Sequence, residues 1–400
     1  MHYKKPNWFF YKLAQFVSFF VAKFIFKRKL IRNEIKNAKG PFVVIANHQA
    51  AYDFVNLIGV TNRRMSFVIS NSFYQSLPIQ GLLDNLAVLP KQQFQTTVSD
   101  MKKMKAVIDA GEPLVIYPAG LMCEDGLSTP IPAATYKLFK WLNVDVYMAK
   151  TSGTYFAMPK WTNGFRNGKT TLDIYKLFSK EELNNLEPEE VKQRTEEALL
   201  FDAYREQENL MYKYKNGTNL NGLEKVLYIC PHCKKEFTIA VKNDNILYCT
   251  ECGFAQKTDE FGFLHKESKV GEEIRYVSDW SKQVFLNVKE KLIRGIENTL
   301  TAETDIYMVS PKKKKYEKVG KGNLSINEKE FSIIGEINNQ TVDLKISLSS
   351  FPTLPFTPGK HIEIQDGKTI YRCVLKEGKL AMKFINMVKA FFEIKNEIKA

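Results

Sequence analysis

The residues best suited to chemistry are a histidine and an aspartate five positions apart, His48 and Asp53. The apolar run at 40–48 predicts a buried strand, and residues 50 to 60 look helical. Five residues turn an ideal helix by about 500°, so the side chains meet only if His48 lies in the turn before the helix and Asp53 in its first turn. A carboxylate that orients a histidine fixes its tautomer and stabilises the imidazolium, so this pair predicts a general base.

The pattern around this pair also limits the chemistry. No serine or cysteine stands in a nucleophile-elbow motif, which favours direct attack by a substrate hydroxyl over a covalent enzyme intermediate. The spacing alone is weak evidence for catalysis, because a histidine that merely satisfies its hydrogen bonds at a helix start shows the same pattern.

Four cysteines form two Cys-x-x-Cys pairs that are separated by 15 residues: Cys230, Cys233, Cys249 and Cys252. This spacing predicts a four-cysteine zinc ribbon, in which four protein ligands leave no open position, so that the Zn²⁺ is structural. Disulfides are the alternative, but they are rare in a reducing compartment. The remaining Cys123 and Cys373 are expected to be buried small residues.

The N-terminal tenth of the chain is both basic and apolar. Residues 1–40 hold ten lysines and arginines against one acid, and ten minus one gives +9 of the total charge of +14. In the apolar run 8–26, Lys12 and Lys23 fall on one helical stripe with Gln15 close by. Two mid-segment lysines argue against a spanning helix, and no cleavage site of a signal peptide follows. We therefore expect a helix that lies in the headgroup region of an anionic membrane; a helix packed on the core is the alternative.

Strands and helices alternate from residue 40 onward, which predicts an α/β fold with a mostly parallel sheet and helices on its faces. An acidic helical extension follows, and 215–222 is a turn-rich linker. Short strands and one amphipathic helix complete the chain. We accordingly divide it into a membrane-anchoring helix (1–39), an α/β domain with its helical extension (40–215), the zinc ribbon (222–265) and a β-rich domain (266–400).

Three blocks within 40–165 resemble those of the lysophospholipid (1-acylglycerol-3-phosphate) acyltransferase family. Val-Ile-Ala-Asn-His-Gln-Ala-Ala-Tyr-Asp at 44–53 is similar to its Asn-His-x-x-x-x-Asp block. Asn-Leu-Ala-Val-Leu-Pro-Lys at 85–91 resembles its second block, with Lys91 in the place of an arginine. Tyr-Pro-Ala-Gly-Leu-Met-Cys at 117–123 resembles its third block, Phe-Pro-Glu-Gly-Thr-Arg-Ser.

The resemblance implies transfer of a fatty acyl group from acyl-CoA or acyl-carrier protein to a glycerolipid hydroxyl. His48 would deprotonate that hydroxyl and Asp53 would hold the histidine, while Asn47, Lys91 and Gly120 would bind substrate. The expected partners are therefore membrane lipids, a lysolipid acceptor and the acyl donor, at the cytoplasmic face of the membrane.

Departures from the family pattern bear on the acceptor. The glutamate and arginine that help to hold the phosphorylated glycerol are here Ala119 and Met122, neither of which can pair with phosphate. Glu124 and Asp125 bring negative charge just beyond the turn. A lysophospholipid with a larger headgroup, or a glycolipid, fits at least as well as lysophosphatidic acid. A catalytically impaired membrane-docking module of the same fold is the alternative function.

The β-rich C-terminal part resembles, in topology only, a pleckstrin-homology or GRAM-like domain. Its lysine run 312–315 suits either a solvated loop or an anionic-lipid contact. Nucleic acid is not an expected partner, because the basic residues gather on the N-terminal helix and not around the cysteines.

Overall fold

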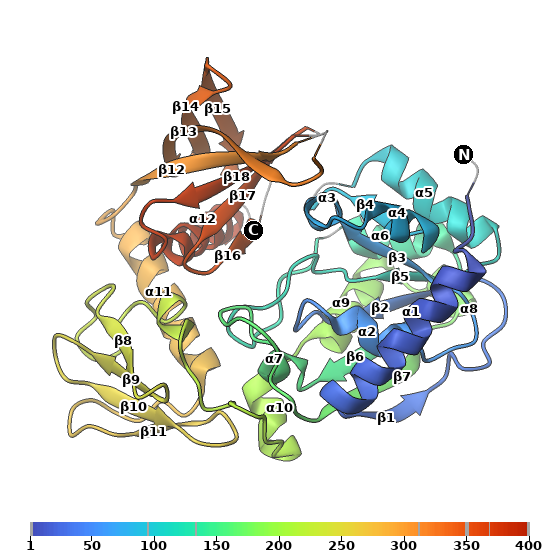
Figure 1. Ribbon diagram of the computed structural model, residues 1–400, viewed down its shortest axis with the longest axis horizontal. Coiled ribbons are helices and arrows are strands. Elements are labelled where there is room, and N and C mark those ends of the chain that lie inside the picture. The colour runs from blue at the N-terminus through green and yellow to red at the C-terminus, as the bar shows by residue number, and fades with distance from the viewer. Residues whose placement is uncertain are drawn as a thin grey trace. The chain divides into compact units, whose positions relative to one another are not determined.

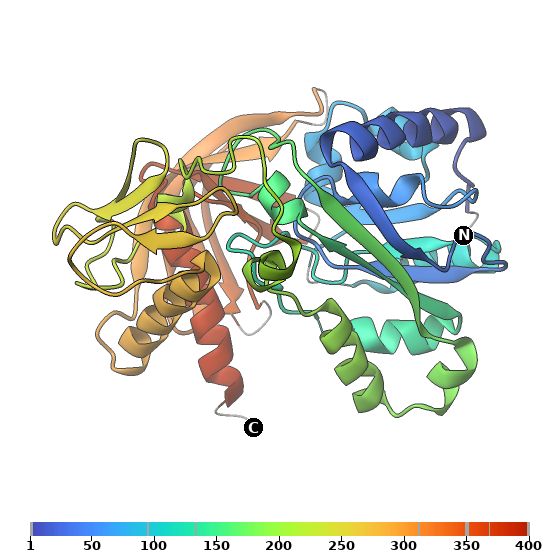
Figure 2. The ribbon, with the colours of Figure 1, turned by 90° about the horizontal axis from the view of Figure 1, so that it is seen from below.

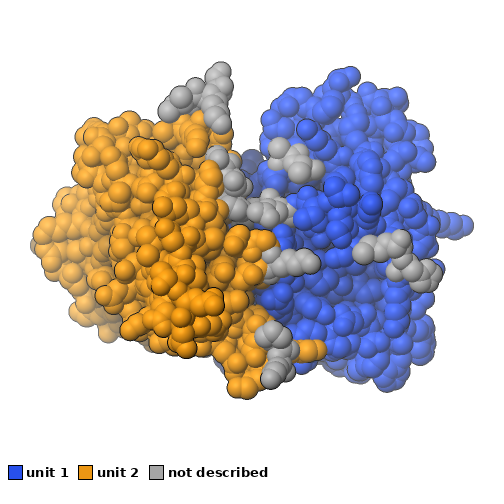
Figure 3. All heavy atoms as spheres, turned by 90° about the horizontal axis from the view of Figure 1, so that it is seen from above, with its two compact units in different colours: residues 1–159, 163–217 blue, residues 160–162, 218–400 orange. Residues whose placement is uncertain are grey.

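The computed structural model describes residues 3–93, 96–132, 134–310, 313–348, 352–367 and 369–397. The chain divides into two compact units (Figure 3). Unit 1 comprises residues 1–159 and 163–217, and unit 2 comprises residues 160–162 and 218–400. The finer domain boundaries at 39/40 and 265/266 stay predictions. Lys312 of the lysine run lies outside the described residues.

Unit 1 is built on a seven-stranded sheet in the order β1-β7-β6-β2-β5-β3-β4 (Figure 1). The β6–β7 pair is antiparallel and the other neighbours are parallel. The predicted parallel-rich α/β architecture is thereby confirmed. The strands are β1 (Arg28–Asn33), β2 (Phe42–Ala46), β3 (Ser66–Ser70), β4 (Leu89–Lys91), β5 (Leu114–Ile116), β6 (Asp145–Ser152) and β7 (Thr170–Phe178).

Helices bury both faces of this sheet, and strand β2 shows how. Its residues Val43 and Ile45 belong to one apolar core, whereas Phe42 and Val44 belong to the other. Alternate side chains of a strand point to opposite faces, so an unbroken apolar run is what a central strand requires. The helices are α1 (Trp8–Phe20) with the π-helical turn η1 (Val21–Ile25), α2 (Asp53–Ile58), α3 (Asn71–Ser76), α4 (Gln80–Asn85), α5 (Val98–Asp109), α6 (Ala134–Leu142), α7 (Thr154–Ala157), α8 (Lys180–Asn185), α9 (Pro188–Leu199) and α10 (Ala203–Leu210).

The N-terminal segment differs from the prediction at its end. The helix stops at Ile25, and β1, which we included in the membrane anchor, pairs with β7 at the edge of the sheet. This strand is mostly exposed and basic, so its sequence carries no buried apolar run to reveal it. Gln15 also differs from its predicted place beside the polar stripe. Its side chain faces the protein and donates to the carbonyls of Ile58 and Thr61 at 3.2 and 3.1 Å.

Unit 2 begins with a four-stranded antiparallel sheet in the order β11-β10-β9-β8. A helix follows, α11 (Val277–Ile293), which the sequence reasoning missed although buried residues recur along it at helical spacing, as at Val277, Trp280, Val284 and Val288. The indole Nε1 of Trp280 donates to the carbonyl of Ile229 at 2.9 Å. The strands of this sheet are β8 (Ile239–Lys242), β9 (Ile246–Cys249), β10 (Ala255–Thr258) and β11 (Leu264–Lys266), preceded by the 3₁₀ turn η2 (Leu223–Lys225).

The rest of unit 2 is a seven-stranded antiparallel sheet followed by the helix α12 (Leu380–Glu397), as seen in Figure 2. Its order is β15-β14-β13-β12-β18-β17-β16. The β-rich, helix-terminated character matches the expectation, while the resemblance to a pleckstrin-homology domain stays a prediction. The strands are β12 (Leu300–Val309), β13 (Tyr316–Ile326), β14 (Glu330–Ile337), β15 (Gln340–Ser347), β16 (Phe356–Thr357), β17 (His361–Asp366) and β18 (Thr369–Leu375).

Candidate active site and metal site

The His48–Asp53 pair forms where β2 ends and α2 begins. His48 lies in the connecting turn and Asp53 is the first residue of α2, as the spacing required. His48 Nδ1 lies 3.0 Å from Asp53 Oδ2. The same carboxylate oxygen accepts the backbone N–H groups of Gln49 and Ala50 at 2.8 and 2.9 Å. Asp53 is thus locked in place by its own turn.

These contacts determine the tautomer of His48. A carboxylate oxygen can only accept hydrogen bonds, so the ring nitrogen that faces it is the donor. Nδ1 therefore carries the proton, and Nε2 is left with a free lone pair. The side chain of Asp53 is fully buried and that of His48 is 19% exposed, so a reactant can reach the histidine ring but not the carboxylate.

Tyr117 forms a second support for the histidine. Its ring lies 4.7 Å from the His48 ring, measured between centroids, at an angle of 40°. Burial, with the nearby charge of Asp53, raises the pKa of Tyr117 well above its ordinary value, so the phenol stays neutral. Sequence reasoning quoted this residue within the third block but gave it no role; its position directly before Pro118 in the block was the available signal.

Cys123 is placed near the histidine but is unsuited to nucleophilic attack. Its backbone N–H donates to the carbonyl of His48 at 3.3 Å. Burial, followed by the charges of Asp125, Glu124 and Asp53, raises the pKa of this thiol well above its ordinary value. The thiolate is the reactive form, so Cys123 is inert. Burial also raises the pKa of Cys373, to about 12.

Asn47 corrects one predicted substrate contact. Its amide donates to the carbonyl of Thr151 and accepts from the N–H of Thr151, both at 2.8 Å. The side chain is buried, with both polar groups used, and it does not border the cavity described next. Asn47 therefore joins the ends of β2 and β6 and holds the turn that carries His48; it is not free to bind substrate.

An apolar cavity of about 300 Å³ opens beside His48. Most of its wall is aliphatic or aromatic, with contributions from α1, α2, α3, α4 and the third block. It is bordered among others by Tyr11, Phe54, Phe73, Leu83, Met104 and Leu138. Such a lining suits a hydrocarbon chain, because burial of each methylene is favourable by about 0.8 kcal/mol.

Lys91 and Gly120 both border this cavity. Lys91 is the only lysine or arginine among the described residues of its wall, and its Nζ donates to the carbonyl of Gln92 at 2.9 Å. Burial lowers the pKa of Lys91. Gly120 has φ +66°, and no other atom lies within 4 Å of the place that a Cβ would take, so the turn needs glycine for its backbone angle and not for space.

The third block presents apolar side chains and buried acids. Ala119 and Met122 border the cavity, and neither offers a charge. Glu124 and Asp125 are buried just beyond, 5% and 8% exposed. Met122, at the position of the resembled block's arginine, therefore offers a phosphate no positive partner.

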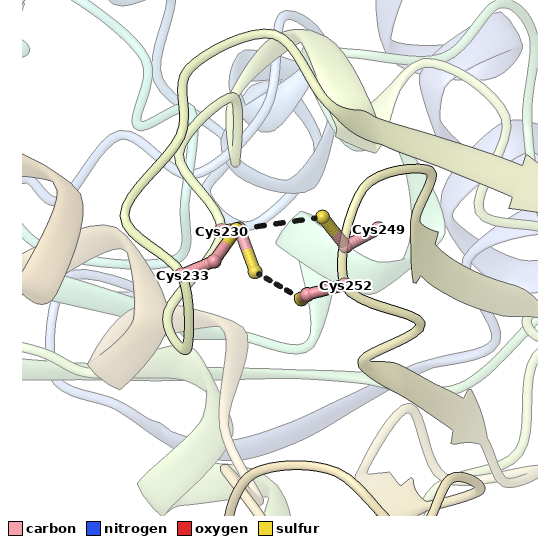
Figure 4. Close-up of side chains that lie close together, drawn as sticks. All are labelled: Cys230, Cys233, Cys249 and Cys252. Atoms are coloured by element: carbon pink, nitrogen blue, oxygen red, sulfur yellow. Dashed lines mark hydrogen bonds between the residues drawn. The ribbon is translucent and has the colours of Figure 1, made fainter.

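The four predicted metal ligands converge from two loops of unit 2 (Figure 4). All four sulfur atoms lie within 4.8 Å of one another, with Cys230 and Cys252 at 3.6 Å and Cys233 and Cys249 at 3.8 Å. A tetrahedral site with metal–sulfur bonds of about 2.3 Å separates its sulfurs by roughly 3.8 Å. The donor set and its spacing therefore fit one tetrahedral metal ion.

Comparisons with known proteins agree with the site at the level of a family. Residues 27–154, which include His48, Asp53 and the third block, match the family model described as Acyltransferase. Among solved structures, the 1-acyl-sn-glycerophosphate acyltransferase PlsC from Thermotoga maritima is 18% identical, with a TM-score of 0.41 over 50% of this chain and 78% of its own. The Ran-binding domain of Nup2 from Ashbya gossypii is 17% identical, with a TM-score of 0.20 over 24% of this chain and 97% of its own. Neither likeness is close enough to assign an activity, and no curated protein is significantly similar in sequence.

Proposed function

We propose that the acyltransferase domain matched at residues 27–154 moves a fatty acyl group from a thioester, acyl-CoA or acyl-carrier protein, to the hydroxyl of a lysophospholipid or related glycerolipid. The observation that carries this proposal is the His48–Asp53 pair at the wall of an apolar cavity. A base beside a space for a hydrocarbon chain is what acyl transfer to a lipid hydroxyl requires.

In the proposed reaction, Nε2 of His48 takes the proton of the acceptor hydroxyl while its oxygen attacks the thioester carbonyl. The carbon–sulfur bond then breaks, and the imidazolium returns the proton to the departing thiolate. The products are an ester and a free thiol, and no redox partner is needed. The buried carboxylate of Asp53 stabilises the imidazolium between these two proton transfers.

The acceptor is proposed to be a lysolipid other than lysophosphatidic acid. Ala119 and Met122 border the cavity and cannot pair with a phosphomonoester. Lys91 remains as a single point charge without a bidentate fork. These residues favour a larger or less charged headgroup.

The enzyme is proposed to work at the cytoplasmic surface of a membrane, with α1 and η1 lying in the membrane plane. Trp8–Ile25 is the one stretch of the described residues that is long and apolar enough to cross a bilayer. Its inner side is nevertheless tied to unit 1 along its length: Tyr11 accepts from the N–H of Met65 at 2.9 Å, Gln15 binds two carbonyls, and the side chain of Asn167 donates to the carbonyl of Phe24 at 3.0 Å. A crossing helix would have to break these contacts.

The outer side of α1 supports the membrane assignment. Together with η1 it exposes large apolar residues, while the small residues Ser18 of α1 and Ala22 of η1 are buried. A helix of a soluble domain shows the opposite arrangement. The exposed set comprises Trp8, Phe9, Leu13, Phe16, Val17, Phe19, Phe20 and Phe24.

A structural zinc ion is proposed for the four cysteines of unit 2. The donor set and the sulfur separations support it, because four thiolates at these distances complete a tetrahedron without an open position.

The deciding experiment compares lipids of cells with and without the protein, complemented with wild type or with His48→Ala. Loss of the protein should accumulate a lysolipid, and only wild type should remove it, since a positioned base contributes about 10²–10⁴-fold. Full rescue by His48→Ala would instead favour the membrane-docking module. The departures from the family pattern at Ala119 and Met122 are the observation that supports this alternative.

A further inference from the structure

Unit 1 has a second group of exposed apolar residues, on α3 and α4. Ile79 and Leu82 are 45% and 36% exposed, and Phe73 is 38% exposed. We call these three residues the α3–α4 patch. Phe73 lies on the six-residue helix α3, Leu82 lies on the six-residue helix α4, and Ile79 caps α4. None of the three side chains is buried by the packing of these helices.

The α3–α4 patch lies on the wall of the apolar cavity. Leu83 and Leu86 of the same segment border the cavity, while Leu82 is turned outward. Phe73 does both, because it borders the cavity and is exposed. The cavity therefore reaches the surface at the patch.

The patch also lies on elements that contact α1. The N–H of Asn7, which caps α1, donates to the carbonyl of Asn85 at the end of α4 at 2.7 Å. Tyr11 of α1 borders the same cavity as Leu83. The exposed apolar residues of α1 and of the α3–α4 patch therefore lie on elements that touch each other and border one cavity.

We propose that the α3–α4 patch is a second bilayer contact, which with α1 seats the rim of the cavity on an anionic membrane. The exposed lysines Lys4, Lys12 and Lys23 on or beside α1 suit an anionic surface. The one acid of α4, Asp84, accepts a hydrogen bond from the hydroxyl of Tyr74 at 2.7 Å. With the rim in the bilayer, a fatty chain passes between membrane and cavity without entering water, where each exposed methylene is unfavourable. The use of this passage rests on the proposed acyl transfer, but the membrane contact does not.

Hydrogen exchange of the full-length protein tests the contact without any assay of activity. Vesicles of phosphatidylcholine with phosphatidylglycerol should slow amide exchange in residues 71–86 as well as in 8–25. Residues 196–202 are the internal control, because they carry Leu200, an exposed apolar residue of unit 1 (65%). Protection limited to residues 8–25 would overturn the proposal.

A double variant, Ile79→Ser with Leu82→Ser, tests what the contact does. Acyl transfer to a lysolipid in vesicles should fall about tenfold, the loss expected from two half-exposed apolar side chains. Transfer to the same lysolipid in detergent micelles should stay within about twofold, because micelles deliver the chain without a flat surface. Leu200→Ser is the matched control and should change neither activity.

Two outcomes of this experiment would refute the role of the patch: unchanged transfer in vesicles, or an equal loss in vesicles and micelles while the variant stays folded. A wild-type protein that transfers no acyl group in either form would refute the proposed function instead. Hydrogen exchange would still decide whether α3 and α4 touch the membrane.

Discussion

Replacement of Asp53 by asparagine tests the proposed general base most directly. The oxygen that binds His48 also accepts two backbone N–H groups. In Asp53→Asn these two donors keep the amide oxygen, and not the NH₂ group, toward the ring. The histidine should therefore retain its tautomer and lose only its negative neighbour. Asp53→Ala is less informative, since each unpaired buried N–H costs about 1–3 kcal/mol of stability.

The structure bounds the size of the effect. A hydrogen bond to a neutral acceptor is weaker than one to a carboxylate by roughly 1–1.5 kcal/mol, which corresponds to about tenfold in rate. At the Nδ1–Oδ2 separation of 3.0 Å, the attraction between imidazolium and carboxylate is about 5.5 kcal/mol for an effective dielectric constant of about 20, or about 10⁴-fold. We expect kcat to fall by about 10²–10³-fold, between these bounds.

The assay is thiol release from acyl-CoA with a lysolipid acceptor, measured on protein whose thermal unfolding matches wild type. The chain provides a matched control in a second pair, where His265 Nε2 lies 2.9 Å from Asp259 Oδ2. Asp259 also accepts two backbone N–H groups, those of Phe261 and Phe263, but on its other oxygen, Oδ1, so Asp259→Asn removes the negative neighbour of a histidine outside unit 1. Asp259→Asn should leave kcat unchanged. A folded Asp53→Asn protein with kcat within about twofold of wild type would refute the assignment of His48 as the base.

Four further outcomes are expected. Metal analysis should find one zinc per chain, and Cys230→Ser should open the ribbon to proteolysis because metal binding and folding are coupled; a folded, metal-free protein would contradict the site. Phe16→Ser with Phe20→Ser and Phe24→Ser should move the protein into the soluble fraction, whereas high salt alone should release wild type only in part; retention after carbonate extraction would show a spanning helix. Ala119→Glu with Met122→Arg should raise transfer to lysophosphatidic acid relative to other acceptors, and an unchanged preference would show that these positions do not select the headgroup. Burial, then Arg372, lowers the pKa of His361 from 6.5 to about 4, so stability should decrease as the pH falls from 6.5 to 4, by up to about 3 kcal/mol, and His361→Gln should flatten this dependence in unfolding measurements.

The geometry around His48 could be predicted because it follows from local chain geometry. A buried strand that ends two residues before the histidine, and a helix that begins at Asp53, leave the two side chains one way to meet. The four cysteines were predictable for a similar reason, since two Cys-x-x-Cys turns each bring their sulfurs together before any tertiary contact forms. The parallel sheet followed from the alternation of apolar runs and helical patterns.

What the sequence could not supply depends on partners distant in the chain. Asn47 is fixed by Thr151, 104 residues away, and no local pattern distinguishes such a clamp from a substrate contact. Gln15 looks like part of a solvent-facing stripe until the carbonyls of Ile58 and Thr61 are brought beside it. The edge strand β1 is exposed and basic, so it lacks the buried run by which strands are recognised.

The proposed zinc ion would have a consequence beyond the ribbon itself, because of the position of the ribbon within unit 2. Glu236, three residues after Cys233, pairs with Lys383 of α12 at 2.6 Å and with Lys291 of α11 at 2.5 Å. Lys383 is buried, and Glu297 is its second partner. If the first cysteine loop were released, Lys383 would lose one of two carboxylates in a place where water cannot replace it, which is strongly unfavourable for a buried charge. Trp280 would lose its acceptor, the carbonyl of Ile229, at the same time. Metal removal should therefore loosen α11 and α12 as well as the ribbon, which makes the four-cysteine site a structural centre of the whole unit.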